Sequence, residues 1–233
     1  MLSLRKSHAR GHADHGWLKS QFSFSFAEYH DPQHMGFRSL RVINQDRIAP
    51  GGGFPTHPHR DMEIFSYVLE GELQHEDSMG NGRVLSPGQI QLMSAGSGIT
   101  HSEFNPSRSV TTHMLQMWIT PRQRGLTPSY TEWHPQPDHD GDAKVLVISP
   151  DGRDGSATIH QDADIYRVRL QPGASIGHML GAGRGLWLQV MRGSLNLDDT
   201  PLATGDAASS ETAGEHTLLA GDAGAEALLF DLR

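Results

Sequence analysis

Short stretches of alternating hydrophobic and polar residues recur along the chain and predict β-strands. Residues 22–26 alternate phenylalanine with serine, and residues 38–48 form a second stretch of this kind. Because successive side chains of a strand point to opposite faces, each stretch has one face to bury, and we expect the three phenylalanines to lie in the core. Further strands are expected over residues 57–68, 72–75, 89–93, 100–104 and 111–119. No sustained helical period is present before about residue 130, so the pattern indicates an all-β fold.

Turn-forming residues separate these stretches at the spacing typical of an antiparallel barrel or sandwich. Turns that contain glycine or proline are expected at residues 49–53, 79–82 and 86–88. Residues 121–142 differ in character, with several prolines and a cluster of aspartates, and we place a domain boundary there. The prediction is an N-terminal domain over residues 1–130 and a C-terminal domain over residues 131–233. A second series of strands is expected from Lys144 onward.

The second half of the chain resembles a degraded copy of the first. Aligning Pro172 with Pro50 places residues 189–195 on residues 67–73, with their turn glycines in register. In this register the positions of His57, His59 and Glu63 are taken by Met179, Gly181 and Gly185. The copy has therefore kept its turns and lost the polar residues, and we expect the C-terminal domain to lack metal ligands.

The composition argues against several classes of function. The formal net charge is −8, the sequence pI is near 6.0, and no long basic run is present, so direct binding to nucleic acid is not expected. The chain has no cysteine, so any metal must be held by histidine, carboxylate or backbone oxygen. No signal-peptide pattern and no apolar run of membrane-spanning length is found, and we expect a soluble, cytoplasmic protein.

Two pairs of potential metal ligands stand out among the 15 histidines. The members of each pair, His57 with His59 and His101 with Glu103, are two residues apart, so each pair points to one side of its strand. If the two strands face each other, three imidazoles and one carboxylate converge. A single His-x-His pair arises readily by chance in a histidine-rich chain. The second pair follows about 40 residues after the first, and both pairs lie near turn glycines. Two such pairs together favour a metal site over ordinary strand residues.

The sequence around these pairs resembles two known motifs. Gly51, His57, His59 and Glu63 follow the first cupin motif, with its last glycine, Gly71, one residue later than usual, and Gly98, His101 and Asn105 follow the end of the second. Longer strings resemble the pirin family, and most closely its bacterial members described as quercetin 2,3-dioxygenases. They lie at residues 56–63, 67–71, 77–81 and 101–107, with Arg10-Gly11-His12 and Met35-Gly36-Phe37 upstream.

The resemblance implies a bicupin, with two stacked antiparallel β-sandwich or barrel domains and one metal in the N-terminal domain. Carried over position by position, the pirin ligands fall on His57, His59, His101 and Glu103. Glu63, a ligand in ordinary cupins, is expected not to bind the metal and to lie around the ligands instead. Iron is the favoured divalent ion, and copper, nickel, manganese, cobalt and zinc also suit this donor set.

The same resemblance implies a metal-dependent dioxygenase that cleaves a flavonol such as quercetin and releases carbon monoxide. The substrate is expected to bind the metal through its 3-hydroxyl, with Glu103 as the general base. One alternative is a non-enzymatic metal or redox sensor that acts as a transcriptional co-regulator through protein partners. Another cupin reaction, such as an isomerisation, is a further alternative, because this fold hosts many chemistries.

Other residues receive simpler interpretations. His75 follows Leu73 by two residues and could line the same face of the barrel, but it is interpreted as a satisfied or exposed strand residue. His113 is interpreted as a core residue, with a place next to the ligands as the alternative. His178 stands one residue before the position aligned with His57, and a shift of one residue in register would reverse its face. With only His216 as a distant partner it is expected to be structural, because metal sites usually need three protein ligands. The methionines and phenylalanines on strands are interpreted as core residues, although Met35, Phe37 and Met93 could reach a flat aromatic substrate.

Overall fold

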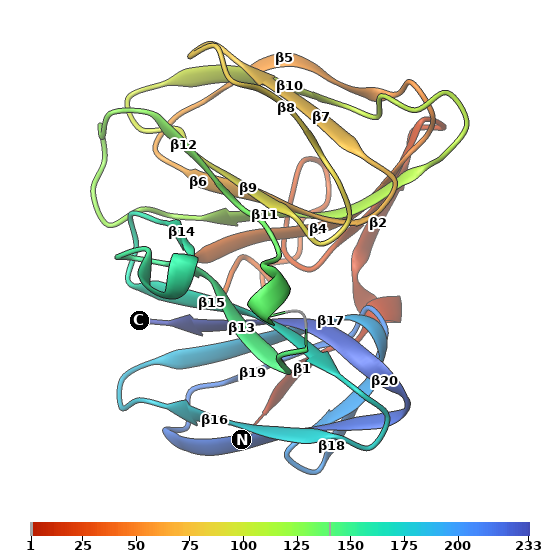
Figure 1. Ribbon diagram of the computed structural model, residues 1–233, viewed down its shortest axis with the longest axis vertical. Coiled ribbons are helices and arrows are strands. Elements are labelled where there is room, and N and C mark those ends of the chain that lie inside the picture. The colour runs from red at the N-terminus through yellow and green to blue at the C-terminus, as the bar shows by residue number, and fades with distance from the viewer. Residues whose placement is uncertain (1, 140) are drawn as a thin grey trace. The chain divides into compact units, whose positions relative to one another are not determined.

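The computed structural model describes residues 2–139 and 141–233, which form strands joined by turns and short 3-10 helices (Figure 1). The all-β prediction is confirmed. The chain divides into two compact units that do not follow chain order. The N-terminal unit comprises residues 11–135 and 157–161, and the C-terminal unit comprises the rest of the described residues. None of the helices in the described part of the chain has the length and apolar character needed to cross a membrane.

Two antiparallel sheets form the N-terminal unit. Its strands are β2 (Gly11–Asp14), β3 (Leu18–Phe22), β4 (Leu40–Ile48), β5 (Gly53–His59), β6 (Glu63–Glu70), β7 (Leu73–Asp77), β8 (Gly82–Leu85), β9 (Ile90–Ser94), β10 (Ile99–Phe104), β11 (Thr112–Ile119), β12 (Ser129–Trp133) and β14 (Ala157–Thr158). The larger sheet has the order β12-β9-β6-β11-β4-β3-β2, the smaller has the order β5-β10-β7-β8, and β14 belongs to neither. Figure 1 shows the two sheets as facing layers, so the inward side chains of both meet between them.

The inward faces follow the alternation expected of strands. On β3 the residues Leu18, Ser20 and Phe22 are buried and those between them are exposed. The strand expected over residues 22–26 is only partly correct, because β3 ends at Phe22 and the chain then turns. Phe24 is buried, as expected for a core residue. A hydrophobic cluster of Leu18, Ile48, Val68, Leu73, Leu85 and Met114 packs between the sheets.

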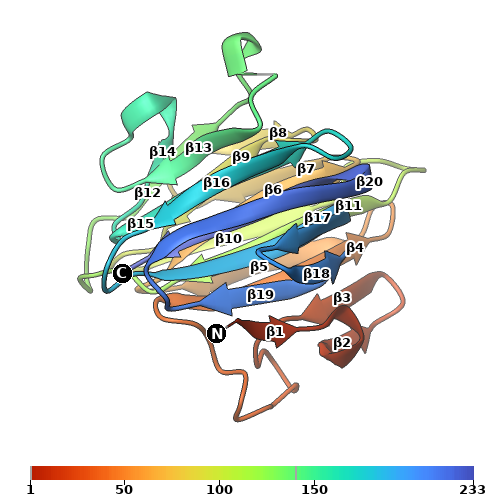
Figure 2. The same ribbon diagram turned by 90° about the horizontal axis from the view of Figure 1, so that it is seen from below.

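The C-terminal unit is built around two long strands. Its elements are β1 (Ser3–Arg5), η1 (Ser7–Ala9), η2 (Pro137–His139), β13 (Lys144–Ser149), η3 (Arg153–Gly155), β15 (Ala163–Leu170), β16 (Ser175–Leu180), β17 (Gly185–Leu197), β18 (Thr200–Ala203), β19 (Ala207–Ser210) and β20 (Gly214–Leu232). The strand order is β1-β19-β17-β20-β15-β13, with β16 on β20 and β18 on β17. Register shifts near Gly193 bend β17 against β20, as β-bulges do. Figure 2 shows β1 beside β19, its antiparallel partner.

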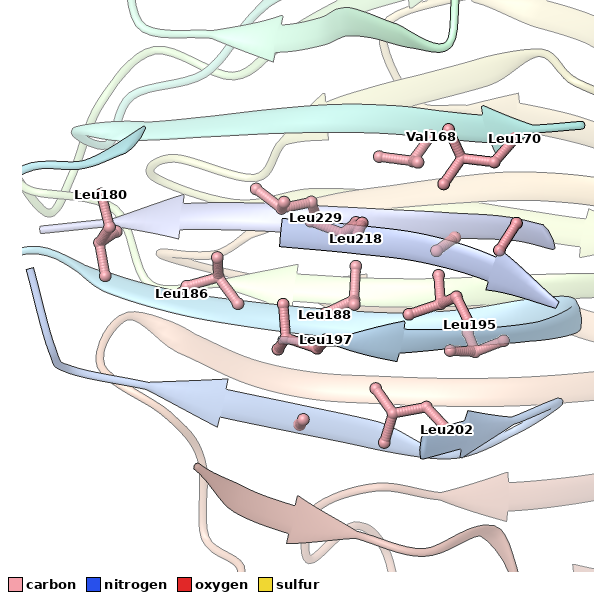
Figure 3. Packing of buried hydrophobic residues seen from close by; sticks show 14 residues of the cluster. Val168, Leu170, Leu180, Leu186, Leu188, Leu195, Leu197, Leu202, Leu218 and Leu229 are labelled. Carbon is pink, nitrogen blue, oxygen red and sulfur yellow. The ribbon is translucent and has the colours of Figure 1, made fainter. Parts of the chain in front are cut away.

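Apolar side chains, mainly leucines, fill the interior of the C-terminal unit. Fourteen buried apolar residues from β15 to β20 form one cluster, which includes Leu188, Leu197 and Leu229. Figure 3 draws these side chains as sticks and labels ten of them. Because each buried leucine contributes about 1.5–3 kcal/mol, this packing stabilises the unit.

The structure agrees with the alignment of the two halves at their turn glycines, but it shifts the alignment by one residue on β16. Gly71 and Gly193 have φ angles of 72° and 70°, and an added Cβ would lie 2.8 Å and 2.1 Å from a backbone carbonyl oxygen, so both turns require glycine. On β16, however, Met179 is 67% exposed and His178 is buried. The inward position is therefore His178, one residue before the position that the alignment equates with His57, because a shift of one residue reverses the faces of a strand.

Candidate metal centre

The strands β5 and β10 bring the two predicted ligand pairs together. They pair antiparallel, with His101 opposite His57 and Ile99 opposite His59. A register shift follows His101, and Glu103 then lies opposite Phe54. Because both pairs point between the sheets, His57, His59 and His101 come together as their spacing predicts, whereas Glu103 groups with His101 and His75.

Three imidazoles form the centre of this site. The ring centroids of His57, His59 and His101 are 4.5 to 4.9 Å apart, and their nearest potential ligand atoms lie within 4.8 Å of one another. The Nε2 atoms of His57 and His101 are only 3.1 Å apart. That separation suits two nitrogens that each lie about 2.1 Å from one ion.

The hydrogen bonds around these rings fit a bound cation. His57 Nδ1 lies 2.8 Å from the carbonyl oxygen of Pro55, which can only accept, so Nδ1 carries the proton and Nε2 offers a lone pair. Burial, reinforced by the neighbouring histidines, lowers the pKa of His101 to about 2. Burial and the charge of His57 lower the pKa of His59 to about 4. Neutral imidazoles with free lone pairs are the form in which histidine binds metal ions.

Glu103 lies at the same centre but in a second group of potential ligands. It is 1% exposed and groups with His101 and His75. Its Oε1 accepts hydrogen bonds from Ser66 Oγ at 3.0 Å and Gln91 Nε2 at 2.8 Å, and its Oε2 accepts one from Gln116 Nε2 at 2.5 Å. Burial raises the pKa of Glu103 to about 7, against the lowering effect of these donors. The carboxylate is thus held in one position by three donors from three strands.

The two glutamines are themselves oriented by aromatic residues. Trp118 Nε1 donates to Gln116 Oε1 at 3.2 Å, and because an indole N–H can only donate, the amide nitrogen of Gln116 faces Glu103. The hydroxyl of Tyr130 donates to Gln91 Oε1 at 3.4 Å and fixes that amide in the same sense. Trp118 also contacts His59 edge to face, with ring centroids 4.9 Å apart.

A cavity of about 450 Å³ opens beside the imidazoles. His57, His59 and Glu103 form part of its wall, and its aromatic lining consists of Trp17, Phe22, Phe26, Phe54 and Trp118. Phe22 is buried as expected and also lines this cavity, and Phe26 lines it while only partly buried. Met35, Phe37 and Met93, considered as residues within reach of an aromatic ligand, are not among the lining residues. Met93 is 1% exposed, as the core interpretation predicts.

Buried polar groups lie on another wall of this cavity. Asn44 and Asp46, two residues apart on β4, both line it and are at most 3% exposed. Asn44 Oδ1 has no hydrogen-bond partner within the described part of the chain. A buried acceptor without a partner costs about 1–3 kcal/mol, so this wall is suited to a ligand that donates hydrogen bonds.

Glu63 lies apart from the candidate ligands. Its Oε1 accepts a hydrogen bond from Ser94 Oγ at 2.7 Å, and its Oε2 accepts one from the backbone N–H of His160 at 3.3 Å. Neither partner is a candidate ligand, and Glu63 belongs to neither group of potential metal ligands in the described residues. The residue that fills the ligand position of ordinary cupins thus anchors residues 157–161 to the N-terminal unit.

Replacing Glu63 by alanine should destabilise the protein and leave the metal bound. The hydroxyl of Ser94 and the N–H of His160 would lose their acceptor, and we expect the free energy of unfolding to fall by about 1–3 kcal/mol. Denaturant unfolding and the metal content of the purified variant measure the two effects. Loss of the metal at unchanged stability would instead make Glu63 a ligand.

The structure also shows where the four other histidines considered from the sequence lie. His75, interpreted as a satisfied or exposed strand residue, is fully buried and its ring contacts His101. His113 is buried and lies 2.9 Å from the amide of Gln45, away from the candidate ligands. In the C-terminal unit His178 Nε2 lies 3.0 Å from Asp231, and His216 lies 2.9 Å from Asp198.

The chain is similar to known proteins over its whole length. It matches the pirin family over residues 3–119 and the quercetinase C-terminal cupin domain over residues 146–232. The quercetin 2,3-dioxygenase of Escherichia coli K12 is 47% identical over 233 residues, which cover 100% of this chain and 99% of that protein.

Solved structures of related proteins are also similar to this chain over nearly its whole length. The crystal structure of the bacterial pirin YhhW from Escherichia coli in complex with nickel(II) matches with a TM-score of 0.94 at 46% identity, over 100% of this chain and 99% of that one. A quercetin 2,3-dioxygenase from Acinetobacter baumannii matches with a TM-score of 0.79 at 20% identity, over 99% of this chain and 85% of that one. The second match shows a shared fold.

Proposed function

The chain belongs to the pirin family, and from this membership and the site described above we propose that it is a metal-dependent dioxygenase that cleaves a flavonol such as quercetin. The observation that carries the proposal is the cluster of three imidazoles at the wall of an aromatic-lined cavity. Relatives at up to 47% identity bear the name quercetin 2,3-dioxygenase. The reaction proposed is opening of the central flavonol ring by dioxygen with release of carbon monoxide.

The ligands proposed for the metal are His57, His59, His101 and Glu103. This donor set of three neutral imidazoles and one carboxylate fits a divalent transition ion, and iron is the ion that we favour. The related bacterial pirin crystallised with nickel(II) supports an ion of this class. When bound, the ion would act as a Lewis acid that lowers the pKa of a coordinated hydroxyl and would supply redox chemistry if it is iron.

Glu103 is proposed as the general base for the substrate 3-hydroxyl. Its carboxylate lines the cavity, and three donors prevent it from rotating away. A base that is already held in position loses little conformational entropy on reaching the transition state, and this favours proton transfer from a hydroxyl at the metal.

The cavity supplies the contacts for a flat polyphenol. Its tryptophan and phenylalanine side chains offer surfaces for ring stacking, and they exclude water from the reacting atoms. Asn44 and Asp46 would accept hydrogen bonds from phenolic hydroxyls on the outer rings. An apolar pocket with a few buried acceptors is the usual design of a site for an aromatic ligand with hydroxyl groups.

Reconstitution of the metal-free protein with single divalent ions tests this proposal. Quercetin loss, dioxygen uptake and carbon monoxide release should proceed in a 1:1:1 ratio with at least one ion. Metal-loaded protein that shows no turnover with any ion would contradict the dioxygenase. That result would favour the alternative, a metal or redox sensor that acts through protein partners.

A further inference from the structure

The structure assigns His75 a positioning role: it holds His101 in the orientation and tautomer that direct Nε2 toward the metal, and Asp77 in turn orients His75. The inference rests on the proposed metal site and is independent of the proposed substrate. It concerns residues on β7, the strand next to β10 in the smaller sheet.

Strand pairing places these residues behind the metal ligands. In the register of β7 and β10, Glu103 lies opposite His75 and His101 lies opposite Asp77. The His75 ring therefore reaches His101 diagonally, and the two Nδ1 atoms are 3.4 Å apart. His75 is 0% exposed, so water does not replace this contact.

The proton positions follow from the geometry. His101 Nε2 faces His57 Nε2 at 3.1 Å, and a cation at that point requires a lone pair on both atoms. The proton of neutral His101 then lies on Nδ1 and is donated to His75 Nδ1. His75 in turn carries its own proton on Nε2, which makes no hydrogen bond within the described residues but lies 3.5 Å from Asp77 Oδ2, close enough for electrostatic attraction. This assignment of protons satisfies the contacts from His57 through His101 to His75 Nδ1 and turns the His75 N–H toward Asp77.

Asp77 and Tyr130 hold His75 in place. The Asp77 carboxylate accepts hydrogen bonds from the backbone N–H groups of Met79 and Asn81 at 2.9 and 3.0 Å, and from Asn81 Nδ2 at 2.8 Å. The Tyr130 ring stacks on His75 with centroids 5.2 Å apart and an interplanar angle of 28°. Groups that are fixed in this way behind a ligand typically change metal affinity 10–100-fold when they are removed.

His75 is not itself a ligand of the same ion. It groups with His101 and Glu103 by distance, but its near atom faces His101 Nδ1, on the opposite side of the imidazole from Nε2. An ion held by the three-histidine cluster would lie at the Nε2 side. His75 therefore acts through His101.

Two variants of nearly equal shape test the role. His75→Leu removes the acceptor, whereas His75→Asn places Oδ1 close to the former position of Nδ1 and keeps it. We expect wild type to bind one cobalt(II) ion per chain, and His75→Leu to bind it about 10–100-fold more weakly with a changed ligand-field absorption spectrum. His75→Asn should recover about tenfold of that loss together with the spectrum of wild type. Chelator competition and absorption titration measure both effects, and thermal unfolding of the metal-free variants provides the matched control for packing.

Four results would overturn the inference. Equal losses in both variants would mean that His75 only packs, and wild-type affinity and spectrum in His75→Leu would mean that it does not act on His101. Two ions in wild type, one of them lost in His75→Leu, would make His75 a ligand. A wild-type protein that binds no ion would overturn the metal site and the inference together, whereas the first three results leave the metal site intact.

Discussion

The double variant His57→Ala/His59→Ala should bind a divalent ion at least about 100-fold more weakly than wild type. Even removal of a group that merely orients a ligand costs 10–100-fold in metal affinity, and this variant removes two of the four proposed ligands. His101 and Glu103 alone are fewer than the three protein ligands that metal sites usually need. Chelator competition and elemental analysis of the purified proteins measure the loss.

The matched control removes two histidines from the surface of the same unit. His12 and His30 are exposed and lie outside the cluster of imidazoles, so His12→Ala/His30→Ala should bind the ion as wild type does. Tight binding of one ion by the His57→Ala/His59→Ala protein would refute the ligand assignment.

Glu103→Gln should lower kcat for flavonol cleavage by about 10²–10⁴-fold when the ion is supplied at saturation. Glutamine keeps the size of the side chain but cannot take the proton of the substrate hydroxyl. Its amide also offers one oxygen in place of two, so at least one of the donors from Ser66, Gln91 and Gln116 loses its acceptor at a cost of about 1–3 kcal/mol. The rate is expressed per bound ion, so that weaker metal binding is not counted as lost chemistry.

Glu63→Gln is the control for this variant, because Glu63 is another fully buried glutamate of the N-terminal unit that lies outside the proposed machinery. Its rate per bound ion should equal that of wild type. If Glu103→Gln retained a wild-type rate per bound ion, another group would have to serve as the base.

The candidate ligands could be found in the sequence because strand geometry has a fixed period. A spacing of two residues puts His57 and His59 on one face whatever the rest of the fold does, and the same holds for His101 and Glu103. The turns at Gly71 and Gly193 could also be predicted from the sequence, because both glycines occupy conformations that other residues avoid.

The groups that support the ligands could not be found in this way. The contact of His75 with His101 depends on the pairing register of β7 with β10, which no local pattern encodes. Phe26 lines the cavity from beyond the turn that follows β3, where the alternating pattern predicts a continuous strand. The alignment of Met179 with His57 failed by one residue, since spacing alone does not show a shift in register. The domain boundary proposed within residues 121–142 stays a prediction.

The exchange of short segments between the two compact units makes the chain hard to divide. A fragment that begins at residue 136 would lack β1, and the edge of β19 that β1 covers would be open to pairing with other chains, a common cause of aggregation. A fragment that stops at residue 135 would lack His160, whose backbone binds Glu63. Truncation at the proline-rich segment should therefore give insoluble or poorly folded halves, and studies of either half require the intact chain.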